Sequence, residues 1–224
     1  MRDLTFPSGC AGLTIFATTV LLLLFGLPHR SDAKGFFSRE SKDAALPVSI
    51  CTEEKDHGRT FVKGRVLIKA PANVVWLSVH EERKKDPDLA YSKVLDQAEN
   101  HYTLEQKFTL IPVIGTSVCI MSDTEVPLER IDYKLVKSDR FKSLEGSWVL
   151  TPCQEGKATF LELSSHIDFG MPVPKAILNS LTARKLERRL KNVRKMAEEI
   201  NAQTANKLVS DNRNRTKESA PPSF

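Results

Sequence analysis

The pair of residues whose spacing best suits chemistry is Glu162 and His166, which lie four residues apart in an alternating segment. Because strand side chains alternate, the two share one face, where a carboxylate beside an imidazole can act as a general acid and base. The apolar residues Leu161, Leu163 and Ile167 occupy the other face. We expect this apolar face to point inward and Glu162 and His166 to face solvent. A one-residue change of register would reverse that assignment.

Other catalytic signatures are weak in this sequence. His57, His80 and His101 stand apart, and no paired-cysteine or His-x-His string provides the converging ligands of a metal site. Gly146-Ser147 lacks the second glycine of a nucleophile elbow and falls in a predicted strand. We therefore predict no cofactor and no metal, and we assign no catalytic residue. Whether the protein is an enzyme stays open, with a binding role preferred.

Tyr133 and Trp148 lie on neighbouring predicted strands, on faces that we expect to point inward. Each side chain joins an apolar ring to a polar tip, so it can pack on the tail of a ligand and bind its headgroup. Ordinary core packing is the alternative for both residues.

A stripe of basic residues follows the predicted long helix at steps of four, three and four residues: Arg184, Arg188, Lys191 and Lys195. Near a membrane, each such residue can attract anionic lipid headgroups by about 1 kcal/mol. The alternative is a solvated helix back that serves solubility. We expect no nucleic-acid partner, because no aromatic residues interleave with the basic ones.

The 224-residue chain, 41% hydrophobic with a formal charge of +5, is long enough for one domain with a leader and a tail. Residues 11–27 are uncharged and apolar, and the small-x-small triplet Ser31-Asp32-Ala33 follows them, as in a secretory signal. This run falls at the lower length limit of a membrane-spanning helix, so an uncleaved anchor is the alternative. We predict residues 1–33 to be a signal peptide or N-terminal anchor and the protein to be exported, either periplasmic or secreted.

After the leader we predict a polar linker or arm (34–58), one ligand-binding domain (59–202) and a disordered tail (203–224). Alternating residues predict strands at 59–69, 90–97, 102–110, 117–125, 131–135, 144–153 and 158–169, with a short helix after Pro71 and a long one from 174 to 201. The short connections make the sheet antiparallel. Because a single long helix covers a twisted sheet incompletely, we expect an apolar hollow between them.

Three strings carry a resemblance to a known family: residues 68–76, residues 146–152, and the helix that follows Pro172-Val173-Pro174. In this order, over roughly residues 60–200, they resemble the START-like (SRPBCC) superfamily, with its polyketide cyclase/dehydrase and coenzyme-Q-binding START-domain members. The resemblance implies an α+β helix-grip fold, a curved antiparallel sheet of about seven strands around a long C-terminal helix. It also implies a deep cavity for lipids, quinones or polyketides.

We therefore expect an exported, monomeric, non-catalytic carrier of a lipid, quinone or similar hydrophobic small molecule. One alternative is a cyclase/dehydrase-like enzyme that uses Glu162 with His166, or Tyr133. Another is a protein that acts on an anionic membrane surface through its basic helix. The residues that we predict to line the cavity and bind the ligand are Tyr102, Phe108, Val118, Ile131, Tyr133, Trp148, Leu161, Leu163, Ile177 and Leu181.

Overall fold

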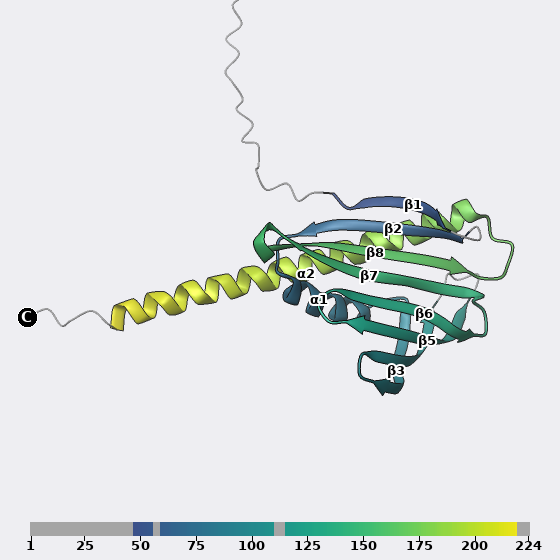
Figure 1. Ribbon diagram of the computed structural model, residues 1–224, viewed down its shortest axis with the longest axis horizontal. Helices are drawn as coiled ribbons and strands as arrows, with labels where there is room; N and C mark the ends of the chain where they lie inside the picture. The colour runs from purple at the N-terminus through teal and green to yellow at the C-terminus, as the bar shows by residue number, and fades with distance from the viewer. Residues whose placement is uncertain (1–46, 56–58, 110–114, 219–224) are drawn as a thin grey trace, which may run out of the picture. The chain divides into compact units, whose positions relative to one another are not determined.

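The computed structural model describes residues 47–55, 59–109 and 115–218 (Figure 1). The predicted leader (1–33) lies outside the described residues, as does most of the predicted arm. No helix among the residues that the structure describes is both long and apolar enough to cross a bilayer.

The described chain folds into eight strands and two α-helices in the predicted order, with one strand added at the start and a short 3-10 helix (Gln154–Gly156) between the last two strands. The elements are β1 (Ser49–Lys55), β2 (Arg59–Ile68), α1 (Ala72–Lys84), β3 (Leu89–Ala98), β4 (His101–Thr109), β5 (Thr116–Val126), β6 (Arg130–Ser138), β7 (Ser143–Cys153), β8 (Ala158–Asp168) and α2 (Lys175–Glu218). This confirms the predicted helix-grip architecture.

All eight strands form a single antiparallel sheet with the order β1-β2-β8-β7-β6-β5-β4-β3. The first strand of the predicted domain therefore pairs with the last one. The sheet is curved, and both helices lie on the same side of it (Figure 1).

Part of the predicted linker or arm (34–58) is an additional strand, β1. It pairs with β2 from Ser49 opposite Arg65 to Lys55 opposite Arg59. This segment is an edge strand whose residues 51–54 are exposed. Its side chains needed no apolar alternation, because backbone hydrogen bonds to β2 hold it in the sheet. The periodicity of the sequence therefore gave no sign of it.

α1 begins where Pro71 ends the strand before it. Proline has no backbone N–H to continue a ladder, and its carbonyl accepts from the backbone nitrogens of Val74 and Val75 at 3.0 and 3.1 Å. The helix then runs to Lys84. It therefore includes Glu82 and Arg83, whose side chains form ion pairs at the candidate site.

The main core lies where the two helices pack on the β1, β2, β8 and β7 half of the sheet. α2 packs tightly against β2 at Gly64, where a Cβ atom would lie only 2.6 Å from the Leu190 side chain. The fully buried residues of this core come from the sheet and both helices, and include Val62, Ile68, Val75, Val79, Leu161, Leu190 and Val193. This half of the domain therefore holds the main hydrophobic core.

α2 is a single helix of 44 residues that runs on past the sheet (Figure 1). This corrects the prediction of a disordered tail from residue 203. Residues 203–218 contain neither glycine nor proline, so nothing in their backbone chemistry ends the helix before Pro221. Their polar composition ends the apolar stripe, which was the signal that placed the end of the predicted helix near residue 201.

The other half of the sheet is more open. Nine of the ten residues of β3 are exposed, and β4 is half-buried along most of its length. A smaller cluster of buried residues, Cys119, Met121, Phe141 and Phe169, sits on this side. The space between this cluster and the main core is the candidate site.

Candidate ligand cavity

A cavity of about 1130 Å³ lies between α1, the first half of α2 and the inner face of the sheet. Most of its wall is apolar. The apolar residues that line it include Val94, Leu104, Phe108, Met121, Phe141, Leu144, Trp148, Leu163, Ile167, Phe169, Leu178, Leu181 and Leu186. Pockets for small molecules usually measure about 300–1,000 Å³. This cavity is therefore large enough for a lipid-sized molecule.

Six of the ten residues that we predicted to line the cavity do so. They are Tyr102, Phe108, Tyr133, Trp148, Leu163 and Leu181. Their contact with a bound ligand stays a prediction.

Three predicted lining residues, Ile131, Leu161 and Ile177, lie elsewhere. Ile131 and Leu161 do point inward, but they are fully buried in the main core. Alternation assigns the face of a strand, whereas the position of a helix over that face decides whether a residue meets a core or a cavity. Ile177 lies in the first turn of α2 and is 54% exposed, outside the cavity.

Val118 is also placed wrongly by the sequence analysis, because β5 presents its other face to the cavity. Met121 pairs with Leu104, and Cys119 pairs with Gln106, so these β5 residues share the inner face of β4. Val118 is exposed. Residues 117–121 are largely apolar on both faces, so their alternation alone could not decide which face points inward.

Glu162 and His166 lie outside the cavity, on the opposite face of β8 from Leu163. The Nδ1 atom of His166 is 2.8 Å from the carbonyl oxygen of Thr60, and its ring packs 5.3 Å from the ring of Phe61. The register that we expected for this strand is therefore correct. The pair cannot act on a molecule held inside the cavity.

Tyr133 lines the cavity, but a backbone group already binds its hydroxyl. The Oη atom donates to the carbonyl oxygen of Ser164 at 2.8 Å. To reach it, the ring crosses Gly146, where any Cβ atom would collide with the Tyr133 hydroxyl and with the Ser164 carbonyl. Burial raises the pKa of Tyr133. The side chain therefore serves as a neutral part of the wall.

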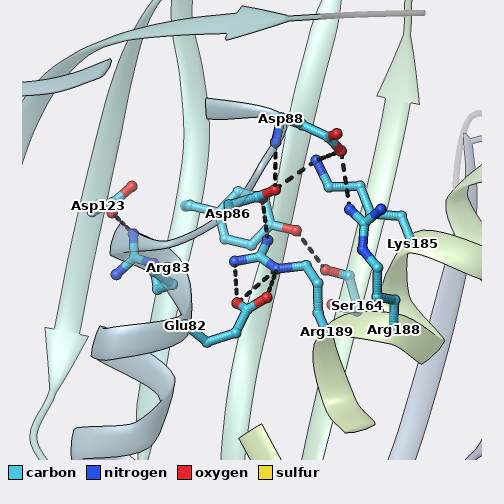
Figure 2. Close-up of polar contacts among 10 residues, drawn as sticks. Glu82, Arg83, Asp86, Asp88, Asp123, Ser164, Lys185, Arg188 and Arg189 are labelled. Atoms are coloured by element: carbon cyan, nitrogen blue, oxygen red, sulfur yellow. Dashed lines mark hydrogen bonds and ion pairs between the residues drawn. The ribbon is translucent and has the colours of Figure 1, made fainter. Parts of the chain in front are cut away.

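A buried ion-pair network connects α2 to α1 and to the loop that follows α1 (Figure 2). The Nε atom of Arg189 donates to the two carboxylate oxygens of Glu82 at 2.8 and 3.1 Å, and an Nη atom lies 3.5 Å from Asp86. The guanidinium also stacks over Trp148, 5.0 Å from the ring centre. This arrangement holds α2 against the end of α1.

The network extends to the surface through Lys185 and Arg188. The Nζ atom of Lys185 lies 3.4 Å from Asp86 and 3.0 Å from Asp88, and Arg188 donates to Asp88 at 3.3 Å. Burial acts to raise the pKa of Asp86, but the nearby Arg189 and Lys185 outweigh it and lower that pKa. Asp86 is therefore held as a carboxylate.

This network was not predicted from the sequence. A signal was present, because Arg189 lies three residues after Leu186 and next to Leu190, on the apolar stripe of the helix. A charge on a buried face needs a partner. Its partner is 107 residues away in the sequence, which local patterns cannot identify.

A second polar cluster lines the cavity where α1 faces β5. It consists of His80 and Arg83 on α1 and Asp123 and Glu125 on β5. Arg83 donates to Asp123 (Figure 2). Asp123 and Glu125 were not predicted because Val118, on the other face of β5, was expected to point into the cavity.

The predicted basic stripe, Arg184, Arg188, Lys191 and Lys195, is exposed along α2. Arg184 and Arg188 also border the cavity. Lys191 pairs within the helix with Glu187. In the described part of the chain, no three histidine, cysteine or acidic side chains are grouped so that they could hold a metal ion.

Comparison with known proteins gives a family match and a set of similar folds. Residues 86–194 match the sequence model of the family described as polyketide cyclase/dehydrase and lipid transport. Human STARD10 is 16% identical, with a TM-score of 0.57 over 80% of this chain and 81% of its own. No sequence of a curated protein matches significantly.

Two bacterial structures share the fold at similar distance. The STAR-related lipid transfer protein from Xanthomonas axonopodis is 16% identical, with a TM-score of 0.53 over 68% of this chain and 99% of its own. The Zhui aromatase/cyclase from a Streptomyces species is 17% identical, with a TM-score of 0.52 over 62% and 93%. These matches confirm the START-like resemblance and the fold. Family and fold together support a hydrophobic-ligand-binding domain of the START or polyketide cyclase-like type.

Proposed function

We propose that this START-like domain is an exported, non-catalytic carrier that holds a hydrophobic molecule between its sheet and α2. The observation that carries the proposal is the cavity of about 1130 Å³ with its largely apolar wall. Each CH₂ group that a ligand buries there contributes about 0.8 kcal/mol. A long apolar chain therefore gains more from this wall than a small polar metabolite does.

The family description joins cyclase/dehydrase activity to lipid transport. The placement of the side chains favours transport. Glu162 and His166, the residues that motivated an enzyme, lie outside the cavity, and the hydroxyl of Tyr133 is bound to the Ser164 carbonyl. An enzyme acting inside the cavity would need other residues than these.

Export is part of the proposal and rests on the apolar run at 11–27 and the small-x-small triplet ending at Ala33. A carrier outside the cytosol would load and unload at a membrane. The exposed stripe from Arg184 to Lys195 supports contact with anionic lipid, because two of its residues border the cavity. A ligand could then pass between membrane and cavity near this stripe.

Ligand binding can be tested by native mass spectrometry and solvent extraction of the purified protein. We expect a bound lipid-like molecule to be released on extraction. Leu104→Trp places a large ring in the cavity and should weaken ligand binding about tenfold, because the ring occupies space that the ligand needs. Thr103→Trp, on the opposite face of β4, is the matched control and should bind as the wild type does. The proposal fails if the wild-type protein binds no apolar molecule, or if the two variants bind equally well.

A further inference from the structure

We propose that the carried molecule is amphipathic, with an alcohol or amine at one end that binds the cluster formed by His80, Arg83, Asp123 and Glu125. We name this cluster the α1–β5 subsite. The inference rests on the proposed function and adds to it the chemical class of the ligand. No residue of the subsite was among those predicted from the sequence.

The fold brings the four side chains together from two elements. His80 and Arg83 are three residues apart on α1 and share one side of the helix. Asp123 and Glu125 are two residues apart on β5 and share the inner face of the sheet. All four line the cavity, so a ligand inside it can reach them.

The subsite contains two carboxylates but a single guanidinium. Arg83 donates to Asp123 and lies 3.6 Å from Glu125. His80 adds no fixed positive charge, because burial, together with Arg83 and Lys84, lowers its pKa. Lys84 also borders the cavity, but its Nζ atom lies 3.0 Å from Glu81. Negative charge is therefore in excess here.

The network on the other side of α1 has no such excess. It matches three carboxylates with three cations: Glu82, Asp86 and Asp88 with Lys185, Arg188 and Arg189. A balanced network of this kind holds elements together and offers little to a ligand. The imbalance is thus a property of the α1–β5 subsite and not of the cavity wall in general.

Glu125 is the group that a ligand would satisfy. Its side chain is 14% exposed, and its carboxylate accepts no hydrogen bond from any residue that the structure describes. The guanidinium of Arg83 and the ring of His80 lie 3.6 and 3.7 Å from this carboxylate, beyond the usual range of a hydrogen bond. Burial raises the pKa of Glu125, with Arg83 opposing and Asp123 adding to the effect. A donor brought by the ligand removes this desolvation cost.

A hydroxyl or an amine meets these requirements, whereas an anionic headgroup does not. Either group donates a hydrogen bond to a carboxylate, and a hydroxyl also accepts one if Glu125 is protonated. A carboxylate or phosphate on the ligand would add negative charge beside Asp123 and Glu125. On the same face of β5, the residue that follows Glu125 and Asp123 toward the apolar wall is Met121, and Leu104 lies opposite it on β4. A ligand tail can therefore continue directly from the subsite.

The test compares four probes with one tail and different ends: hexadecane, hexadecanol, hexadecylamine and hexadecanoate. Affinity is measured with the whole protein by displacement of the fluorescent probe N-phenylnaphthylamine. We expect the alcohol and the amine to bind about tenfold tighter than the alkane, the effect of one charge-assisted hydrogen bond. Hexadecanoate should show no such gain.

Glu125→Gln removes the charge and keeps the shape, and should abolish the gain for hexadecylamine while hexadecane binds as before. Glu125→Asp keeps the charge and should retain part of the gain. Glu129→Gln, an exposed glutamate next to β6, is the matched control and should change nothing.

The outcomes separate the subsite from the proposed function. If all four probes bind equally well, or if hexadecanoate binds most tightly, the subsite is refuted while the carrier function stands. The same holds if Glu125→Gln binds the amine as tightly as the wild type does. If no probe binds to the wild-type protein, the carrier function itself is refuted.

Discussion

Replacing Arg189 with methionine measures what the buried ion-pair network contributes to stability. The guanidinium binds Glu82, whose side chain is 4% exposed, and lies near Asp86, whose side chain is 5% exposed. Methionine has a similar length and no charge. The variant therefore leaves two buried carboxylates without their main cation, while the apolar packing of the helix is kept.

The size of the effect follows from the geometry. Removing one partner of a buried ion pair costs about 3–5 kcal/mol, and losing the stacking over Trp148 costs about 1 kcal/mol more. Lys185, 3.4 Å from Asp86, stays in place and offsets part of this loss. We expect the free energy of unfolding to fall by about 3–4 kcal/mol, which lowers the melting temperature by roughly 6–16 °C for a domain of this size.

The assay is urea unfolding followed by far-ultraviolet circular dichroism. Arg188→Met is the matched control, because Arg188 is 47% exposed and its contact with Asp88 is a surface pair. Such a pair contributes less than about 1 kcal/mol. If Arg189→Met costs no more than Arg188→Met, the network does not hold α2 in place and the reasoning is wrong.

The same network predicts a dependence on pH. Burial opposes ionisation of Asp86, but Arg189 and Lys185 outweigh it, so its pKa in the folded state lies below the ordinary value. Its contribution to stability is present above the ordinary aspartate pKa and is lost as the pH falls through the lowered value. The stability gap between wild type and Arg189→Met should therefore shrink below about pH 4. A gap that stays constant down to about pH 3 would contradict this account.

Three further predictions concern the strand packing, the basic stripe and the leader. Gly146→Ala should lower the free energy of unfolding by about 1–3 kcal/mol, because the new methyl group displaces the ring of Tyr133; chemical denaturation measures it, and an unchanged midpoint would disprove it. Arg184→Glu should weaken binding to vesicles with anionic lipid about tenfold at low salt, whereas Lys207→Glu, farther along α2, should leave it unchanged. Vesicle sedimentation measures the bound protein, and an equal loss of binding in the two variants would argue against a role of the basic stripe. N-terminal sequencing of protein recovered outside the cytosol should start just after Ala33, and an intact leader there would favour the anchor.

The elements with a clean pattern could be predicted from the sequence. β4 alternates apolar and polar residues, and α2 carries an apolar stripe. The periodicity of each segment therefore predicted whether it forms a strand or a helix and which of its faces is buried. β1 could not be found in this way, because an edge strand is held by backbone pairing and its side chains are free to be polar. The end of α2 was missed because the apolar stripe that marked the helix in the sequence stops before the helix does.

The candidate site could be predicted only in part, because it depends on contacts between distant segments. Tyr133 and Trp148 were found because their strands alternate clearly. Glu125 was missed because the face of β5 is set by its pairing with β4, and residues 117–121 of this strand are largely apolar on both sides. The ion pair between Arg189 and Glu82 could not be predicted, because the two residues lie 107 positions apart in the sequence.

The main core and the cavity share β7 and β8, whereas β3 and β4 contribute to the cavity and not to the main core, and this has an evolutionary consequence. Most residues that secure folding are packed under α1 and α2, whereas many of those around the cavity are exposed or half-buried on β3 and β4. Substitutions on these two strands cost little in the free energy of unfolding, because partly exposed side chains lose little packing when replaced. Descendants of such a domain can therefore acquire new ligands while inheriting an unchanged scaffold.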